Sequence, residues 1–182
     1  MPEYRRHRIP GGTYFITIVT YQRQPILTLP KSREILRYAW KTVQSRYPFS
    51  TDAICLLPDH IHTLITLPEN DDNFPKRISE IKRIFSKEFH LHIPNQLEKN
   101  PSRIKRRENT LWQRRYWDHY IRNEQDLNNH TNYIHYNPVK HELTTSVNEW
   151  PWSSFHRYVK AGYYEPDWGS DVSFDDSTEF GE

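Results

Sequence analysis

Two histidines separated by one residue stand in the apolar segment LLPDHIHTLITLP, residues 56–68. In a β-strand, His60 and His62 fall on the same face, with their Cα atoms roughly 6.5–7 Å apart because each residue rises about 3.3 Å. Two imidazoles at that separation can bind one divalent ion. In a helix the same side chains would point about 200° apart. The strand interpretation therefore predicts a metal site, and a buried structural pair with hydrogen-bonded imidazoles is the alternative.

A second candidate element lies downstream, where a helix is predicted from Asn123 to about Tyr136 and is expected to end before Asn137-Pro138. Tyr133 and Asn137 are one helical turn apart, so their side chains can approach the same point. An amide oxygen beside two imidazoles suits Mn²⁺ or Mg²⁺ when phosphate oxygens complete the shell. A tyrosine on such a helix is also a common packing residue, and this alternative is open.

A second His-x-His pair, His90 and His92, tests whether the first pair is specific. It lies at the end of a helical pattern and just before Pro94. On a helix the two imidazoles point apart, and we expect no metal site there.

The elements that must position these residues follow in the order strand, helix, strand, strand, helix, strand. Apolar periodicity predicts helices at 32–47 and 74–90 and strands at 13–20, 51–57 and 60–67, with a strand or extended segment at 111–120. This order predicts an α+β fold: a ferredoxin-like split βαβ sandwich, with an antiparallel sheet and helices on one face. The tyrosine-bearing helix follows at its C-terminal side.

The composition indicates one folded domain. The 182 residues allow a real core, and 14% aromatic residues argue against general disorder. No apolar run approaches the ~20 residues that span a membrane, and the N-terminus lacks the apolar region of a signal peptide. The single cysteine, Cys55, excludes an internal disulfide and a multi-cysteine metal site, and it is expected to be a buried thiol. These features favour a cytoplasmic protein.

The net charge of +2 hides a separation of charges. Residues 76–115 hold twelve Lys or Arg against four Glu, whereas residues 161–182 hold seven Asp or Glu and no Lys or Arg. A basic middle and an acidic tail favour a polyanionic partner. The alternative is a solvated helix face with a solubilising terminus.

Candidate nucleic-acid contacts come from a basic N-terminal arm, from the helix at 74–90, and from the segment WQRRYWDHY. Arginines interleaved with aromatic rings offer phosphate partners and stacking planes, as in single-strand binders. The same aromatics can equally be strand core. The candidates are Arg5, Arg6, Arg8, Lys82, Arg83, Arg114, Arg115, Trp112, Tyr116 and Trp117.

Several segments together resemble one family. HIH after LLPD, then WQRRYWDHYIRNEQD and NYIHYNPVKH, are similar to the REP-associated tyrosine transposases, members of the single-tyrosine HUH transposase superfamily. The opening RRHRIPGGTYFITIVT and the later WPWSSFHRY are similar to the same family, so the resemblance covers roughly residues 4–160. HIH alone is a weak motif, whereas HIH with the tyrosine helix in this order is specific.

The resemblance implies a metal-dependent endonuclease and strand transferase. Such enzymes act on single-stranded DNA at palindromic, REP-type hairpins through a covalent 5′-phosphotyrosine. The family pattern makes Tyr133 the nucleophile and His60, His62 and Asn137 the ligands of Mg²⁺ or Mn²⁺. It also implies a catalytic domain with a basic arm at residues 1–160 and a monomer rather than a dimer. The charge distribution adds an acidic tail at 161–182.

The chain departs from the family pattern at Glu142, where many relatives have glycine after VKH. We expect this residue to alter the turn there. The alternative function is a protein that binds hairpin DNA without significant catalytic activity.

Overall fold

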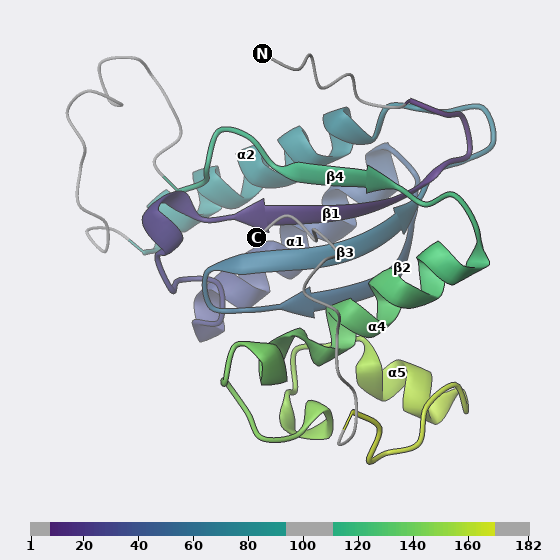
Figure 1. Cartoon of the computed structure of the whole chain (residues 1–182). Helices are drawn as coiled ribbons and strands as arrows, with labels where there is room; N and C mark the ends of the chain where they lie inside the picture. The colour runs from purple at the N-terminus through teal and green to yellow at the C-terminus, as the bar shows by residue number, and fades with distance from the viewer. Residues whose placement is uncertain (1–7, 94–110, 170–182) are drawn as a thin grey trace, which may run out of the picture.

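The computed structural model describes residues 8–93 and 111–169. The described strands form one sheet in the order β2-β3-β1-β4, and every neighbouring pair is antiparallel. This order is that of a ferredoxin-like sandwich, so the predicted α+β fold is confirmed (Figure 1). In chain order the elements are β1 (Thr13–Val19), α1 (Pro30–Arg46), β2 (Ser50–Leu56), β3 (His60–Thr66), α2 (Phe74–His92), β4 (Trp117–Tyr120), α4 (Glu124–Lys140) and α5 (Phe155–Lys160), with short 3-10 turns at Tyr21–Arg23 and Val147–Glu149.

The two central strands, β1 and β3, are buried on both faces because helices cover the sheet on both sides. β1 is β-branched or aromatic throughout, and side chains alternate between the two faces along it. Ile16 and Ile18 point to one apolar cluster, and Phe15 points to the other. The sheet is therefore the middle layer of the molecule.

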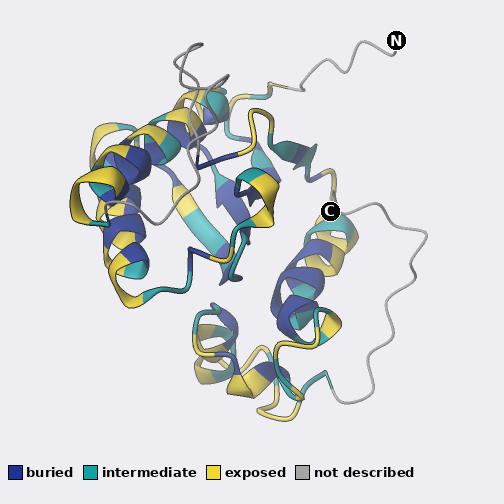
Figure 2. Cartoon of the chain, turned by 90° about the vertical axis from the view of Figure 1, so that its left-hand side faces the viewer, coloured by how far each residue is buried: buried dark blue, intermediate teal, exposed yellow. Residues whose placement is uncertain are grey.

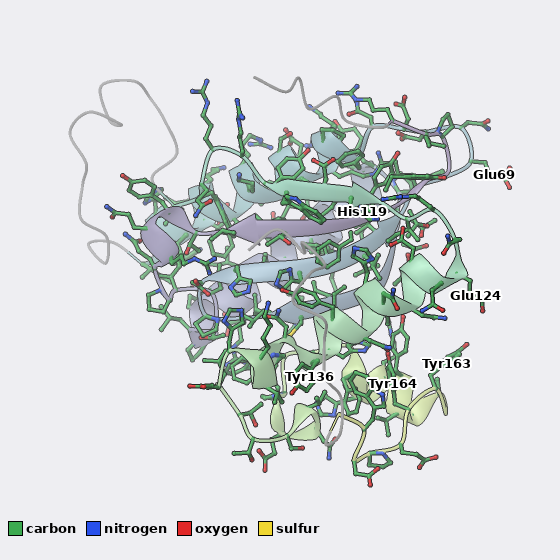
Figure 3. The ribbon with its side chains drawn as sticks, viewed as in Figure 1. Glu69, His119, Glu124, Tyr136, Tyr163 and Tyr164 are labelled. Atoms are coloured by element: carbon green, nitrogen blue, oxygen red, sulfur yellow. The ribbon has the colours of Figure 1, made fainter. Side chains whose placement is uncertain are left out.

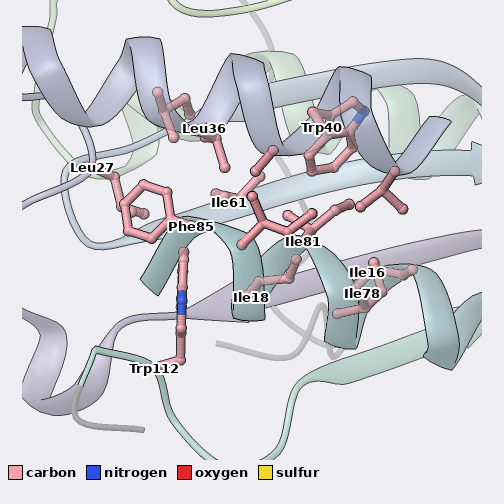
Figure 4. Close-up of a cluster of buried hydrophobic side chains, with 14 of the residues drawn as sticks. Ile16, Ile18, Leu27, Leu36, Trp40, Ile61, Ile78, Ile81, Phe85 and Trp112 are labelled. Atoms are coloured by element: carbon pink, nitrogen blue, oxygen red, sulfur yellow. The ribbon is translucent and has the colours of Figure 1, made fainter. Parts of the chain in front are cut away.

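Helices α1 and α2 cover the first face. Their buried positions face the sheet and their exposed positions face outward (Figure 2). The resulting core is shown in Figure 4, and its labelled members are Ile16, Ile18, Leu27, Leu36, Trp40, Ile61, Ile78, Ile81, Phe85 and Trp112. This layer makes a rigid support for β1 and β3.

Helix α4 lies on the second face, where it packs over β2 and β3 (Figure 1). Tyr133 and Ile134 of α4 join an apolar cluster with Phe15 and Leu64 of the sheet. The strand residues that point to this face therefore lie directly under α4.

Helix α4 runs through Asn137 and Pro138 to Lys140, so the predicted end before Asn137 is wrong. Pro138 sits in the last turn, where a proline removes a single intrahelical donor. The helix then ends in a left-handed cap. Leu143 N–H donates to Pro138 O at 2.9 Å, and Glu142, the residue just before Leu143, has φ 55°.

Glu142 thus makes this turn in a left-handed conformation that an L-residue adopts with strain. The expected change of the turn relative to the family stays a prediction. We expect Glu142→Gly to raise the free energy of unfolding by about 1 kcal/mol, because glycine adopts this backbone without strain. Urea denaturation measures the change. Glu165→Gly, at an exposed glutamate outside the positive-φ positions, is the matched control and should not stabilise. Equal or lower stability of the Glu142→Gly protein would contradict the interpretation.

Two other segments differ from simple expectation. Within 111–120 only Trp117–Tyr120 is a strand, while Trp112 makes an isolated bridge to Thr20. Beyond residue 160, Tyr164 donates a hydrogen bond to Asn132 of α4, so packing continues past the predicted domain end. The division at residue 160 stays a prediction. Across the described residues, no helix has the length and apolar character needed to cross a membrane.

Candidate active site

The two histidines of β3 lie on the face of the sheet that α4 covers. His60 and His62 are 2% and 0% exposed, and their ring centroids are 4.8 Å apart with the planes at 84°. Ile61, between them, belongs to the opposite core. The predicted alternation of this strand is therefore confirmed.

Each imidazole is oriented through its Nδ1 atom. His60 Nδ1 lies 2.6 Å from Asp59 Oδ1, and His62 Nδ1 lies 2.9 Å from Thr17 Oγ1. Such partners set the ring orientation and the tautomer, and they direct Nε2 to the other side of each ring. Burial raises the pKa of Asp59, but hydrogen bonds and charge from His60 and Arg23 outweigh it, so the net pKa lies below its usual value. Asp59 is therefore a carboxylate that can support His60 near neutral pH.

The donor set fits a divalent ion. Metal sites in proteins commonly use two histidine Nε2 atoms as ligands, with each Nδ1 atom hydrogen-bonded to a carboxylate or another polar group. Cys55, paired with His62 across β2 and β3, does not add a thiolate, because burial raises the pKa of its thiol despite a hydrogen bond with Ser153. The histidine pair thus offers nitrogen donors without a thiolate, and the choice of Mg²⁺ or Mn²⁺ stays a prediction.

Tyr133 is brought to this pair by α4. Its ring centroid lies 5.4 Å from that of His62 and 6.1 Å from that of Phe15, and the residue is 1% exposed. Asn137, one turn further along α4, is fully buried. The structure therefore places a tyrosine from one helix against histidines from a distant strand.

Two residues that sequence reasoning missed also reach the site. Lys140 Nζ donates to Tyr133 Oη at 3.0 Å and lies 4.8 Å from the centroid of the same ring. The ring of His141 lies 5.0 Å from that of His60. Lys140 follows Tyr133 by about two helical turns, so the signal was present, but the helix was predicted to end too early for it to count.

The arrangement combines the parts needed for nucleophilic attack on a phosphodiester. A hydroxyl oxygen is held by a cationic donor, and two oriented imidazoles lie beside it. A lysine ammonium donates to a phenolic oxygen and can also attract a phosphate. The described contacts therefore bring a lysine ammonium and an imidazole ring to the Tyr133 side chain.

A different group, His119, Asp126 and His130, joins β4 to the start of α4. Asp126 accepts from His119 Nε2 at 2.9 Å, and a carboxylate oxygen lies 3.0 Å from His130 Nδ1. The two rings are stacked at 4.6 Å and 15°, and the ligand atoms of all three residues lie within 4.8 Å of one another, so the group could also hold a metal ion. Figure 3 shows His119 on β4, beside the face that carries the site. We assign this group the role of a clamp that fixes the first turn of α4.

Ionisation supports the clamp. Burial raises the pKa of Asp126, but hydrogen bonds from His119 and the Arg122 backbone outweigh it, and the net pKa is lowered. Burial lowers the pKa of His130. The carboxylate is therefore ionised between the two rings near neutral pH.

The predicted DNA contacts are distributed over both sides of the molecule. Arg114 and Arg115 are exposed in the loop before β4, and Arg8 is exposed at the start of the described chain. Arg5 and Arg6 lie outside the described residues. Lys82 Nζ donates to Gln113 O at 2.7 Å, and Arg83 pairs with Glu80, both from α2 on the face away from Tyr133.

The three aromatic candidates differ in exposure. Trp112 is 1% exposed and packs against Phe85, so its core interpretation holds and base stacking by it is not available. Tyr116 is half-buried and contacts Phe74 at 6.4 Å. Trp117 is half-buried on the Tyr133 side of the sheet, stacked on His119 at 5.9 Å. Trp117 is therefore the candidate closest to the proposed chemistry.

Comparison with known proteins agrees with this geometry. The family model described as "Transposase IS200 like" matches residues 10–137. A Haemophilus influenzae protein assigned to the REP-associated tyrosine transposases is 48% identical over 170 residues, covering 93% of this chain and 94% of that protein. The "REP-associated tyrosine transposase" of Escherichia coli K12 is 41% identical over 173 residues, covering 95% and 94%.

A solved structure shares the whole fold. It is described as a REP-associated tyrosine transposase bound to a REP hairpin, and it superposes with a TM-score of 0.81 at 39% identity over 98% of each chain. The matched family and these relatives together cover the strands, the histidine pair and the tyrosine helix. The chain therefore belongs to the REP-associated tyrosine transposases of the IS200-like family, which are DNA-cleaving and DNA-joining enzymes.

Proposed function

We propose that this protein nicks and rejoins single-stranded DNA beside REP-type hairpins, with Tyr133 as the nucleophile. The observation that carries the proposal is the meeting of Tyr133 with Lys140 and the His60–His62 pair. The solved relative described as bound to a REP hairpin supports the choice of DNA.

The chemistry follows from the residues present. The Tyr133 oxygen attacks phosphorus, and the bond from phosphorus to the 3′-oxygen breaks. The tyrosine loses its hydroxyl proton, and the leaving 3′-oxygen gains one to become a 3′-hydroxyl. The product is a 5′-phosphotyrosine, which retains the energy of the phosphodiester, so rejoining needs no ATP. An unperturbed tyrosine has a pKa of about 10. Lys140 is placed to favour the ionised oxygen and to orient it.

His60, His62 and Asn137 would hold the divalent ion. When bound, that ion polarises the phosphate and offsets negative charge that develops during attack. Asp59 and Thr17 keep the two imidazoles in the ligating orientation through their Nδ1 atoms. The clamp at Asp126 fixes the start of the helix that carries the nucleophile.

The protein is proposed to act as a monomer. His60 and His62 on β3 and Tyr133 on α4 belong to the same chain and already lie together. No second copy is needed to complete this set. Arg8, Arg114, Arg115 and Trp117 are the residues proposed to guide DNA toward it.

An end-labelling experiment tests the function. A hairpin oligonucleotide with a single-stranded flank is incubated with the protein and Mn²⁺ or Mg²⁺, then resolved on a denaturing gel. A label on the 3′ end of the downstream fragment should migrate with protein, and the upstream fragment should carry a free 3′-hydroxyl. A covalent species that carries the upstream fragment instead would contradict the proposed polarity.

The second candidate, hairpin binding without significant catalysis, is favoured by one observation. Tyr133 and both histidines are at most 2% exposed, so a phosphate has little access to them in this conformation. Tight binding of the hairpin with no adduct under either metal would establish this candidate in place of the first.

Lys140→Met is expected to slow adduct formation roughly 10- to 100-fold at saturating DNA, because it removes a charged donor from the nucleophile. Single-turnover kinetics measure the rate. Lys140→Arg keeps a cation and should recover part of it. Lys160→Met, on the exposed side of α5, is the matched control and should react as the wild type does. An unchanged rate in Lys140→Met would remove Lys140 from the mechanism.

A further inference from the structure

A groove runs between α1 and the segment 151–157, along the β2 edge of the sheet. Its volume is about 740 Å³. The β2 residues on its floor, Ile54 and Leu56, belong to the core under α1 and α2. The groove is therefore on the opposite side of the sheet from Tyr133.

Basic side chains line this groove from two walls. Arg33, Arg37 and Lys41 recur every four residues and so share one side of α1, where they span about 12 Å of helix axis. Arg157 faces them from α5. Within the described part of the chain, none of the lining residues is acidic, although the whole sequence has 25 basic and 23 acidic residues. Positive charge is thus concentrated along this groove.

Two of the four cations are fixed in place. Arg33 Nε donates to Thr28 O at 3.2 Å, and its guanidinium lies 4.9 Å from the centroid of the Trp152 ring. Arg157 donates to the backbone oxygens of Thr51 and Asp52 at the edge of β2. These contacts orient the guanidinium groups without neutralising them.

The other two cations are exposed. Arg37 and Lys41 project from α1 into the groove, and among the described residues neither forms a salt bridge. Exposed basic residues usually pair with nearby acids or with solvent. Here they stand beside pre-oriented arginines and the half-buried Trp152, whereas Trp40 belongs to the core beneath.

The basic surface continues beyond this groove. Lys41 also lines a second hollow, of about 590 Å³, between α1 and α2. That hollow contains Arg46, Arg83 and Lys87 with a single acidic residue, Glu88. One basic track therefore extends from Arg157 across α1 onto α2, the helix whose basic face was predicted to bind DNA.

We propose that the groove binds the phosphate backbone of a single-stranded DNA segment, on the side of the molecule opposite Tyr133. A positive groove with aromatic side chains is the usual form of a single-strand site, and a narrow concave surface fits a strand better than a duplex. The four cations contact phosphates and read no bases, so binding is independent of sequence. The inference rests on the proposed function only in taking DNA as the ligand.

Charge reversal tests the groove. The probe is a fluorescent oligo-dT strand, which forms no hairpin, and its affinity is measured by anisotropy over a range of salt concentrations. Arg37→Glu/Lys41→Glu should lower the affinity tenfold or more at low salt. The slope of log K against log salt should fall by roughly 1.4, since each lost phosphate contact contributes about 0.7 for a single strand. The neutral pair Arg37→Gln/Lys41→Gln should show a smaller loss in the same direction.

Lys31→Glu is the matched control. It reverses one charge on the same helix, half the charge change of the double variant, outside the groove and at a helix N-terminus where an acid is tolerated. Equal affinity and slope for the double variant and this control would overturn the proposal, as would a loss confined to duplex DNA. Thermal melting verifies that each variant is folded.

Failure of the inference can be distinguished from failure of the proposed function. Adduct formation on hairpin DNA reports on Tyr133, whereas oligo-dT affinity reports on the groove. A wild type that forms the adduct, with a double variant that binds oligo-dT normally, rejects the groove alone. Groove-dependent oligo-dT binding without any adduct rejects the nucleophile alone.

Discussion

Tyr133→Phe is expected to abolish the covalent protein–DNA species and to lower strand cleavage by at least about 10⁴-fold. The variant lacks the hydroxyl oxygen proposed to form the phosphotyrosine bond, and loss of a nucleophile is among the largest single effects in enzymes. The measurement is the rate of adduct and nick formation on labelled hairpin DNA. Because phenylalanine fills the same space against Phe15 and His62, folding should be retained.

Tyr136→Phe is the matched control for this variant. Tyr136 lies on the same helix, three residues after Tyr133, and its ring lies against Gly169 in the C-terminal segment (Figure 3). The control should cleave at the wild-type rate. Cleavage that survives Tyr133→Phe and is lost in Tyr136→Phe would move the nucleophile to Tyr136, and survival in both variants would indicate attack by water.

The second large effect is expected at the histidine pair. His60→Ala/His62→Ala should lower the affinity for Mn²⁺ by roughly 100-fold or more and remove metal-dependent cleavage, because both imidazole ligands are lost. Isothermal titration calorimetry measures the affinity without reference to activity. Hairpin binding should remain, since the predicted DNA contacts lie elsewhere.

The chain supplies a control with the same sequence pattern. His90 and His92 are also separated by one residue, but they lie exposed at the end of α2. His90→Ala/His92→Ala should therefore leave the Mn²⁺ affinity unchanged. If this control loses as much affinity as the β3 variant, or if the β3 variant loses none, the metal site is misplaced.

The strand and its histidine pair were predictable because their signal is local. Alternation along a β-strand follows from backbone geometry alone, so His60 and His62 had to share a face once the strand was assigned. The element order was predictable for the same reason, since each element has its own apolar period. The buried state of Cys55 also follows from its apolar neighbours.

The end of α4 was not predictable by the same rules. A proline normally marks a helix boundary, and only the cap at Glu142 and the packing of the last turn show that Pro138 is inside. Because the helix was predicted to end too early, Lys140 was not considered. Its seven-residue spacing from Tyr133 places the two side chains on the same helix face only if the helix continues through Pro138. Local propensity and tertiary context disagreed here, and tertiary context prevailed.

The aromatic and basic segments show a second limit. Trp112 and Trp117 stand in one run of sequence, yet the first is in the core and the second lies beside His119. The basic face of α2 and the tyrosine of α4 are on opposite sides of the sheet (Figure 1). Sequence composition indicates that such residues bind DNA, but it contains no information about which face they occupy.

The sequence by itself determined the fold class, the common face of His60 and His62, and the one-turn relation of Tyr133 to Asn137. Each of these depends on the repeat of a strand or a helix. Only the tertiary structure decided that Lys140 contacts Tyr133, that Asp126 of α4 bonds His119 of β4, and that basic residues gather in a groove between α1 and the segment 151–157. Most of these contacts join residues far apart in the chain, which only packing brings together. The contact of Lys140 with Tyr133 spans two turns of α4, and the sequence alone did not show that this helix continues so far.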